Sequence, residues 1–290
     1  MRKTKNMIKV FMFLQICLLG MTGNSWGEEA LSKNALPLWE LGLFNGAVRL
    51  PHYRGADEYK LYVLPLPYFI YRGKFIQSDK DGVKGIFFKT PHFESIISLS
   101  GNPPVDNDNK AREGMPELNA LFEVGPALKW FFRGRDALDT LCLQMAARGA
   151  FSINFDSGAD VAYQGLHGSV HLIYNNRSLF ERNGLSLVFN VGTDFADHEL
   201  NSYFYDVSED HVLPGRHFYE SDGGYAGFSA SANLLKTITK SLSLGMYCRW
   251  DNMSGTVSED SPLMKEKNNF VVGCALIWKI AESGRLVNSE

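Results

Sequence analysis

The feature that most constrains this fold is an alternation of apolar and polar residues with a period of two. In 242–250, for example, Leu244 and Met246 alternate with Ser243 and Gly245. Successive side chains of a strand point to opposite faces, so each such segment has one apolar face and one polar face. Segments of about ten residues with this pattern are typical of transmembrane β-barrels. The clearest are 121–132, 185–196, 242–250 and 270–280.

Three observations favour a membrane barrel over a soluble β-sandwich. The segments run to about ten residues, whereas strands of soluble domains usually have about five or six. Aromatic residues such as Trp130, Trp250 and Trp278 lie at segment ends, where membrane barrels carry their interfacial girdles. The polar faces carry charges that a dry core would not tolerate unpaired but a wet lumen would. These candidate lumen residues are Glu40, Glu94, Glu123, Lys129, Arg148 and Arg249.

The sequence therefore predicts an all-β protein, an antiparallel up-and-down transmembrane barrel of about 12 strands. If the short hairpin 74–89 is not part of the wall, the alternative is 10 strands. Both numbers are even, as expected of single-chain bacterial barrels, and the long loops then all fall on the outer side. The predicted strands are 38–50, 62–72, 74–79, 83–89, 93–101, 121–132, 138–151, 165–175, 185–196, 225–237, 242–250 and 270–280. The long outer loops are 102–120, 152–164, 197–224 and 251–269.

The first 27 residues predict a secretory signal peptide. A basic start is followed by a mostly apolar stretch, and Ser25 and Gly27 supply small residues for cleavage. We expect a signal peptide over 1–27, a barrel over 28–280 and a C-terminal tail over 281–290, with export through the general secretory pathway to the outer membrane. Without residues 1–27 the chain keeps 25 basic and 32 acidic residues, a net charge of −7. Such an acidic chain is a poor nucleic-acid binder.

Cysteine usage does not suggest a disulfide framework. Cys142, Cys248 and Cys274 remain after the predicted cleavage, and an odd number cannot all pair within one chain. We interpret them as small apolar residues.

Several short motifs, in order along most of the chain, resemble the MipA/OmpV family, whose name abbreviates MltA-interacting protein. They are Pro51-His52-Tyr53-Arg54-Gly55-Ala56, Leu64-Pro65-Leu66-Pro67-Tyr68, Tyr71-Arg72-Gly73-Lys74-Phe75, Asn201-Ser202-Tyr203-Phe204-Tyr205-Asp206-Val207, Gly223-Gly224 and Asp260-Ser261-Pro262-Leu263. Two departures stand out. The family usually has Gly after the aromatic pair of the fourth motif, and it usually ends at an aromatic residue closing the last strand, whereas here Ala281 to Glu290 follow Ile280.

The resemblance implies an outer-membrane barrel. In the best-known member it implies a scaffold that joins a lytic transglycosylase to a bifunctional murein synthase. Other members are described as adhesins or porin-like proteins, so the resemblance indicates location better than activity. Two classes of function stay open: a scaffold or interaction barrel, and a pore for small solutes. The lumen charges could pair across a narrow barrel and close it.

We expect no catalytic, cofactor or metal site. His167, Ser169 and His171 share one face of the strand 165–175, but residues four apart on a strand lie about 13 Å apart, too far for one zinc. No motif of the type G-x-S-x-G accompanies the serines. The loop residues Asp106, Asn107, Asp108, Asp156 and Asp160 lack the Gly and Glu spacing of a calcium loop.

The predicted topology gathers basic residues at the inner, periplasmic rim. We hypothesise that Arg133, Arg135, Arg177 and Arg182 form part of a docking face for an acidic partner, such as a murein enzyme. The alternative is that this rim only contacts anionic inner-leaflet phospholipid, which attracts Lys and Arg by roughly 1 kcal/mol each.

Overall fold

The computed structural model describes residues 36–72, 76–79, 82–105, 109–135, 137, 139–154, 160–176 and 184–287. The predicted signal peptide, 1–27, lies outside these ranges. Short helices are η1 (Lys110–Arg112), α2 (His198–Tyr205) and η2 (Glu209–His211). None of the helices in the described ranges is long and apolar enough to cross a membrane. The strands are β1 (Leu36–Pro37), β2 (Trp39–Pro51), β3 (Tyr59–Arg72), β4 (Ile76–Asp79), β5 (Gly82–Lys89), β6 (Phe93–Asn102), β7 (Ala120–Phe131), β8 (Asp139–Asn154), β9 (Asp160–Asn176), β10 (Leu185–Ala196), β11 (Gly224–Thr237), β12 (Leu242–Asn252), β13 (Asn268–Glu282) and β14 (Leu286–Val287).

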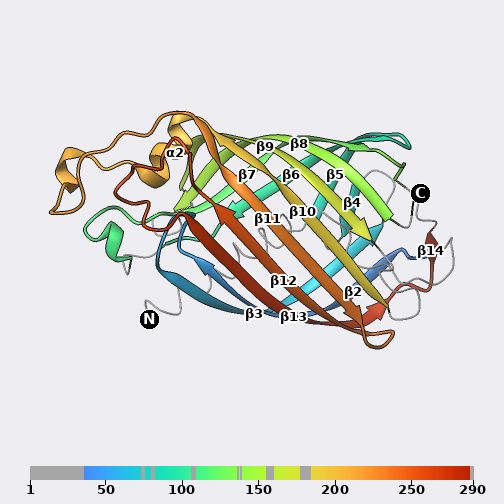
Figure 1. Cartoon of the computed structure of the whole chain (residues 1–290). Coiled ribbons are helices and arrows are strands. Elements are labelled where there is room, and N and C mark those ends of the chain that lie inside the picture. The colour runs from blue at the N-terminus through green and yellow to red at the C-terminus, as the bar shows by residue number, and fades with distance from the viewer. Residues whose placement is uncertain are drawn as a thin grey trace.

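Strands β2 to β13 form one closed barrel in which each strand pairs with its neighbours in the chain (Figure 1). All the pairings are antiparallel, and the barrel closes where β13 pairs with β2, with Val272 opposite Arg49 and Glu282 opposite Glu40. This confirms the predicted up-and-down barrel and its count of twelve strands. The short hairpin 74–89, which the alternative of ten strands left out, supplies β4 and β5. Strand β4 is the shortest barrel strand, with four residues.

Long loops gather at one end of the barrel and short turns at the other (Figure 1). We call these the long-loop end and the short-turn end. In outer-membrane barrels the long loops face the outside of the cell and the short turns face the periplasm.

The largest differences from the predicted strand boundaries are at the end of 138–151 and at the starts of 165–175 and 62–72. Strands β8 and β9 stay paired as far as Asn154 opposite Asp160, which shortens the predicted loop 152–164. Phe151 packs against Phe122 and Tyr163, and such cross-strand aromatic contacts stabilise the longer hairpin. Strand β3 begins at Tyr59, earlier than predicted, because it pairs with the end of β2 up to Pro51.

The C-terminal strands continue beyond the predicted end of the barrel at Ile280. Strand β13 runs to Glu282, and β14 pairs with β1 in a separate two-stranded sheet. The backbone NH of Leu38 donates to the carbonyl of Arg285, and that of Ser283 donates to the carbonyl of Trp39. The described part of the tail is therefore bound to the beginning of the barrel.

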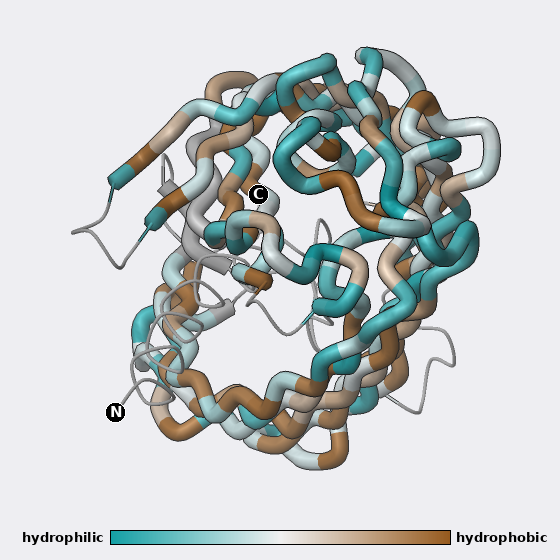
Figure 2. Tube along the Cα trace, turned by 90° about the vertical axis from the view of Figure 1, so that its left-hand side faces the viewer, coloured by the Kyte–Doolittle hydropathy of each residue, from teal (hydrophilic) through white to brown (hydrophobic). Residues whose placement is uncertain are grey.

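Side chains alternate between the outer wall and the lumen as predicted. On β12 and β13 the even-numbered residues face outward: Met246 is 55% exposed and Trp278 is 50% exposed. The odd-numbered residues face the lumen, and Asp251 and Asn269 among them are buried. Figure 2 shows the mixture of apolar and polar residues around the ring. On β3, however, the inward residues Leu64 and Leu66 are also apolar. The inner face is thus polar mainly on β7 to β12 and apolar on β3.

The described cysteines are free thiols. Cys142 is buried, and Cys248 and Cys274 are exposed on the outer wall. Their positions fit the interpretation as small apolar residues.

Candidate functional site

Four loops fold together over the long-loop end, and we call this assembly the cap. The loops are those between β2 and β3, β6 and β7, β10 and β11, and β12 and β13. Viewed from this end, they fold across part of the ring of strands (Figure 2). Most of their buried apolar residues form a single cluster, so the cap has a core of its own. The cluster consists of Tyr53, Ala56, Val105, Met115, Leu118, Tyr205, Val207, Met253 and Leu263.

Hydrogen bonds join the cap loops to one another. The hydroxyl of Tyr53 donates to the carbonyl of Leu263 at 2.9 Å, and that of Tyr205 donates to the carbonyl of Arg54 at 2.8 Å. The hydroxyl of Ser261 donates to the carbonyl of Tyr205 at 2.7 Å. Burial raises the pKa of both tyrosines, so they remain protonated donors. Three motifs that lie far apart in the sequence, around Tyr53, Tyr205 and Leu263, therefore meet in space.

The helix α2 is fixed to the barrel wall by the residue before it. The carboxylate of Asp197 accepts from the backbone NH of Leu200, which caps the helix, and from the NH of Leu166 in β9 at 2.7 Å. Gly165 has a φ of 119°, and a Cβ there would lie 2.2 Å from an Asp197 oxygen. Only glycine fits this close approach.

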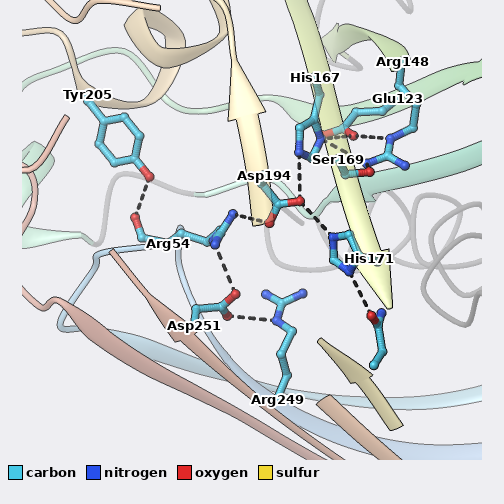
Figure 3. Close-up of polar contacts among 11 residues, drawn as sticks. Arg54, Glu123, Arg148, His167, Ser169, His171, Asp194, Tyr205, Arg249 and Asp251 are labelled. Carbon is cyan, nitrogen blue, oxygen red and sulfur yellow. Dashed lines mark hydrogen bonds and ion pairs between the residues drawn. The ribbon is translucent and has the colours of Figure 1, made fainter. Parts of the chain in front are cut away.

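Below the cap, a network of charged side chains lies across the lumen (Figure 3). Arg54 reaches from the cap between two strands: its Nη1 is 3.0 Å from Asp194 Oδ2 on β10, and its Nε is 3.3 Å from Asp251 Oδ1 on β12. Arg249 Nε donates to the other oxygen of Asp251 at 2.8 Å. The raised pKa of Arg54, due to these carboxylates despite the opposing effect of burial, keeps the guanidinium charged.

The network continues from Asp194 on β10 along the neighbouring strands β9, β8 and β7. His167 lies between two carboxylates, with Nδ1 2.6 Å from Glu123 Oε2 and Nε2 3.4 Å from Asp194 Oδ1. Arg148 Nε donates to the same Glu123 oxygen at 3.0 Å. His171 Nε2 is 3.2 Å from Asp194 Oδ1. We call the residues Arg54, Glu123, Arg148, His167, His171, Asp194, Arg249 and Asp251 the lumen network.

The histidines that the sequence singled out do face the lumen, but they share a carboxylate. Asp194 lies opposite Ser169 in the β9–β10 register, midway between His167 and His171, and so reaches both. The hydroxyl of Ser169 accepts from Arg148 Nη2 at 3.3 Å. The ring nitrogens of both histidines contact carboxylate or amide oxygens instead.

Among the predicted lumen charges, Glu123 pairs with Arg148, but the two lie on the neighbouring strands β7 and β8, so this ion pair does not cross the barrel as predicted. Glu94 lies 4.0 Å from Arg135, and Arg249 pairs with Asp251 rather than with a predicted partner. Sequence reasoning missed Arg54, Asp194 and Asp251 as members of the network. For Arg54, the sequence did offer a signal: this residue follows the predicted strand 38–50 and belongs to the motif that begins at Pro51.

Of the four hypothesised docking residues, Arg133 and Arg135 lie at the short-turn end, between β7 and β8. Arg133 is exposed there and its Nη1 is 3.0 Å from Asp139 Oδ2. The side chain of Arg135 is only 17% exposed. Arg177 and Arg182 lie outside the described residues.

Within the described part of the chain, no group of three or more His, Cys, Asp or Glu side chains is placed to hold a metal ion. Of the loop residues weighed for calcium, Asp160 begins β9, and Asp106, Asn107, Asp108 and Asp156 lie outside the described residues.

A family model described as "MltA-interacting protein MipA" matches residues 41–280 of this chain. The chain belongs to the MipA family. The match covers every barrel strand from β3 to β12 and nearly all of β2 and β13, together with the whole cap. The MipA motifs around Tyr53, Tyr205 and Leu263 are those that build the cap. This chain is thus an outer-membrane β-barrel protein.

Solved structures that resemble the chain are outer-membrane proteins of low identity. A bacterial polysaccharide outer membrane secretin is 9% identical, with a TM-score of 0.36, covering 84% of this chain and 99% of that one. The Pseudomonas putida toluene transporter TodX is 9% identical, with a TM-score of 0.35, covering 90% and 95%. Outer membrane phospholipase A from Escherichia coli is 11% identical, with a TM-score of 0.29, covering 84% and 94%. Likenesses this distant carry no functional argument. Among curated proteins, none matches the chain.

Proposed function

We propose that this MipA-family protein is an outer-membrane scaffold without catalytic activity, which holds periplasmic murein enzymes at its short-turn end. The observation that carries the proposal is that the cap folds over part of the long-loop end, with the ion pairs of the lumen network beneath it. A barrel whose mouth is partly covered by a packed core, and whose lumen holds ion pairs, is less suited to passing solutes. The rim at the short-turn end is then the face proposed for docking.

The family description, MltA-interacting protein, supports a murein-cleaving enzyme as one partner. The proposal extends this to a lytic transglycosylase and a murein synthase held together, as the family resemblance implies. A protein exported through the general secretory pathway by a cleaved signal, 1–27, would present its short-turn end to these enzymes.

Charge at the short-turn end supports an acidic docking partner. The side chain of Arg133 is 70% exposed and that of its partner Asp139 is 42% exposed. Exposed ion pairs contribute only about 0.2–1 kcal/mol, so Arg133 can exchange Asp139 for a carboxylate on another protein. Arg135 is less suited, because it is mostly buried beside Glu94. Lys240, in the turn between β11 and β12, adds an exposed positive charge at this end.

The test is a pull-down of a purified lytic transglycosylase by the folded barrel. We expect the Arg133→Glu, Arg135→Glu, Arg177→Glu, Arg182→Glu variant to lose most of the captured enzyme, and capture by the native barrel to fall as salt rises. The matched control is Lys265→Glu, which reverses an exposed charge on the cap. Unchanged capture by the rim variant, or no capture by the native barrel, would leave only the interpretation that the rim contacts phospholipid.

Conductance in planar bilayers separates the scaffold from the pore. We expect the native protein to show no steady channels. Regular single-channel steps from the folded barrel would favour the small-solute pore instead.

One observation favours an adhesin-like role as a second candidate. In the longest cap loop, Val212, Leu213 and Phe218 are 45%, 49% and 47% exposed. Arg216 holds this loop in place by donating to the carbonyls of Ala111 and Glu113. Cells carrying Val212→Ser, Leu213→Ser, Phe218→Ser should then attach less to host surfaces or to other cells, and equal attachment would exclude this role.

A further inference from the structure

Between β3 and β6 the barrel wall is held together by very few residue pairs. Strand β3 pairs with β2 from Tyr59 to Tyr71, but it pairs with β4 only at Tyr71 and Arg72. Strand β5 pairs with β6 only between Glu94 and Ile96. The hairpin of β4 and β5 lies near the short-turn end (Figure 1). Towards the long-loop end, therefore, the remaining lengths of β3 and β6 have no paired strand between them among the described residues. We call this part of the wall the opening.

The backbone groups that β3 presents to the opening follow from the pairing on its other side. The amide of His52 donates to the carbonyl of Glu58, and the β2–β3 register continues from this pair without a shift. In an antiparallel pair, the residues of a strand alternate between bonding to the partner strand and pointing away from it. The even-numbered residues of β3 therefore bond to β2, and the odd-numbered residues point their backbone groups to the opening.

Two of these odd-numbered residues are Pro65 and Pro67. Proline has no amide hydrogen, so sheets accept it mainly on an edge strand, with its nitrogen on the unpaired side. In hydrocarbon an amide without a partner is costly, because no water is present to accept from it. The two prolines remove such donors from the middle of β3. The motif Leu64-Pro65-Leu66-Pro67 thus has the composition of an open edge rather than of a strand paired on both sides.

The facing edge belongs to β6 and keeps its amides. The amide of Phe131 donates to the carbonyl of His92, so the even-numbered residues of β6 bond to β7 and the odd-numbered residues point to the opening. Leu99 and Gly101 are odd-numbered residues beyond Ile96, where the described pairing with β5 ends. The two edges of the opening therefore differ, because β6 presents hydrogen-bond donors and the middle of β3 does not.

Apolar side chains border the opening on both faces of the wall. Leu61 and Val63 of β3 point outward and are 64% and 69% exposed. Leu64 and Leu66 of β3 and Ile96 of β6 face inward and are buried. An opening with such borders, in a wall that crosses the membrane, is filled more favourably by hydrocarbon than by water.

We propose that the opening between β3 and β6 binds a membrane lipid. A hydrocarbon chain of the lipid lies between the two edges beside Pro65 and Pro67, and a carboxyl or ester oxygen accepts from the amides of Leu99 and Gly101. These amides are close to the long-loop end of β6, so the polar part of the lipid stays near the membrane surface while its chain points to the middle. An added β-strand is a poorer occupant, because two of the donors it would need are missing from β3.

Photocrosslinking from inside the lumen tests the proposal. A benzophenone amino acid takes the place of Ser100, which lies on the lumen face of β6 like Ser98, whose hydroxyl accepts from Arg148. The matched control position is Ser231. It is also a half-buried serine on the lumen face, and its strand β11 is paired on both sides, with β10 and β12.

Both barrels are folded in phosphatidylcholine vesicles that contain either an alkyne-tagged phospholipid or alkyne-tagged palmitate. We expect tagged adducts at Ser100 and none above background at Ser231, with a probe at the outward Met246 as the positive control. Adducts in only one arm would identify whether the chain comes from a phospholipid or from a free fatty acid. No adduct at Ser100 in either arm, or equal adducts at Ser100 and Ser231, would overturn the proposal.

Proline variants test the open edge without a probe. Pro65→Ala and Pro67→Ala each add an amide that points to the opening. Pro126→Ala on β7 is the matched control, because Pro126 points to β8 and its new amide lies opposite Ala147. In lipid vesicles the urea midpoint should fall for the two β3 variants and rise for Pro126→Ala. A rise for all three would mean that β3 is paired on this side. Neither experiment depends on the docking proposal, which concerns the short-turn end.

Discussion

Arg54 Nη1 lies 3.0 Å from Asp194 Oδ2, although the two residues are 140 positions apart in the chain. Arg54 belongs to a cap loop and Asp194 to the barrel wall. The ion pair therefore connects the cap to the wall, and the second contact of Arg54, with Asp251, connects it to another strand. This arrangement makes Arg54 the residue through which the cap and the lumen network depend on each other.

Arg54→Gln should loosen the cap and open the barrel mouth. Removing one partner of a buried ion pair usually costs about 3–5 kcal/mol. We expect the lower end of this range, because His167, His171 and Arg249 still contact the two carboxylates. In planar bilayers the variant should show brief channel openings that the native protein lacks.

The control for this experiment is Arg49→Gln. Arg49 lies nearby on β2 but on the outer wall, where its guanidinium stacks at 3.9 Å over the ring of Tyr59. Losing this exposed contact costs about 0.5–1 kcal/mol and should not change conductance. Channel openings of equal frequency in both variants would argue against Arg54 as the connection between cap and wall.

Arginine on the outer wall should be costly in proportion to its depth in the membrane. Met246 is 55% exposed and lies near the middle of β12, so Met246→Arg should destabilise the folded barrel by about 2–4 kcal/mol. Leu244 also faces outward but lies nearer the end of the strand, so Leu244→Arg should cost less. Ser243→Arg, on the inner face, should cost least. Urea unfolding in lipid vesicles measures all three, and equal costs would contradict the assigned faces.

Local alternation was sufficient to predict the barrel. The number of strands, and which side chains face the membrane or the lumen, depend on a pattern that each segment carries by itself. It was less informative on β3, where Leu64 and Leu66 on the inner face and Leu61 and Val63 on the outer face are all apolar. A strand that is apolar on both faces has no period of two. Its start at Tyr59 is determined instead by the length of its partner β2.

The lumen network could be predicted only in part. Glu123 and Arg148 lie on neighbouring strands at charged positions of the predicted inner faces, so their pairing follows from the fold. Arg54 belongs to a loop, and its direction depends on how the cap packs. The contact of Asp194 with two histidines depends on the register between β9 and β10, which periodicity alone does not specify.

Ser169 should not react with a fluorophosphonate probe of serine hydrolases. It is 4% exposed, and its Oγ accepts from Arg148 instead of donating to a histidine. A serine is activated as a nucleophile by a neighbouring base, and the nearby rings of His167 and His171 contact Asp194. Mass spectrometry of the treated protein should find no stoichiometric label, with a known serine hydrolase as the positive control. Full labelling of one serine would contradict the proposed absence of catalysis.

The attachment of α2 within the cap should weaken as the pH rises. Nδ1 of His198 donates to the carbonyl of Ser221, and this hydrogen bond is the main reason that the pKa of His198 is raised above its usual value. A raised pKa in the folded protein means that the stabilisation is fully present below the unfolded pKa of about 6.5 and is lost as the pH passes the higher folded value. Cleavage of the loop after α2 by a protease should therefore be faster at pH 9 than at pH 6, after correction for the intrinsic activity of the protease. His198→Gln has no titrating ring and should show the same corrected rate at both values. A native rate that does not change with pH would show that this hydrogen bond does not hold the loop in place.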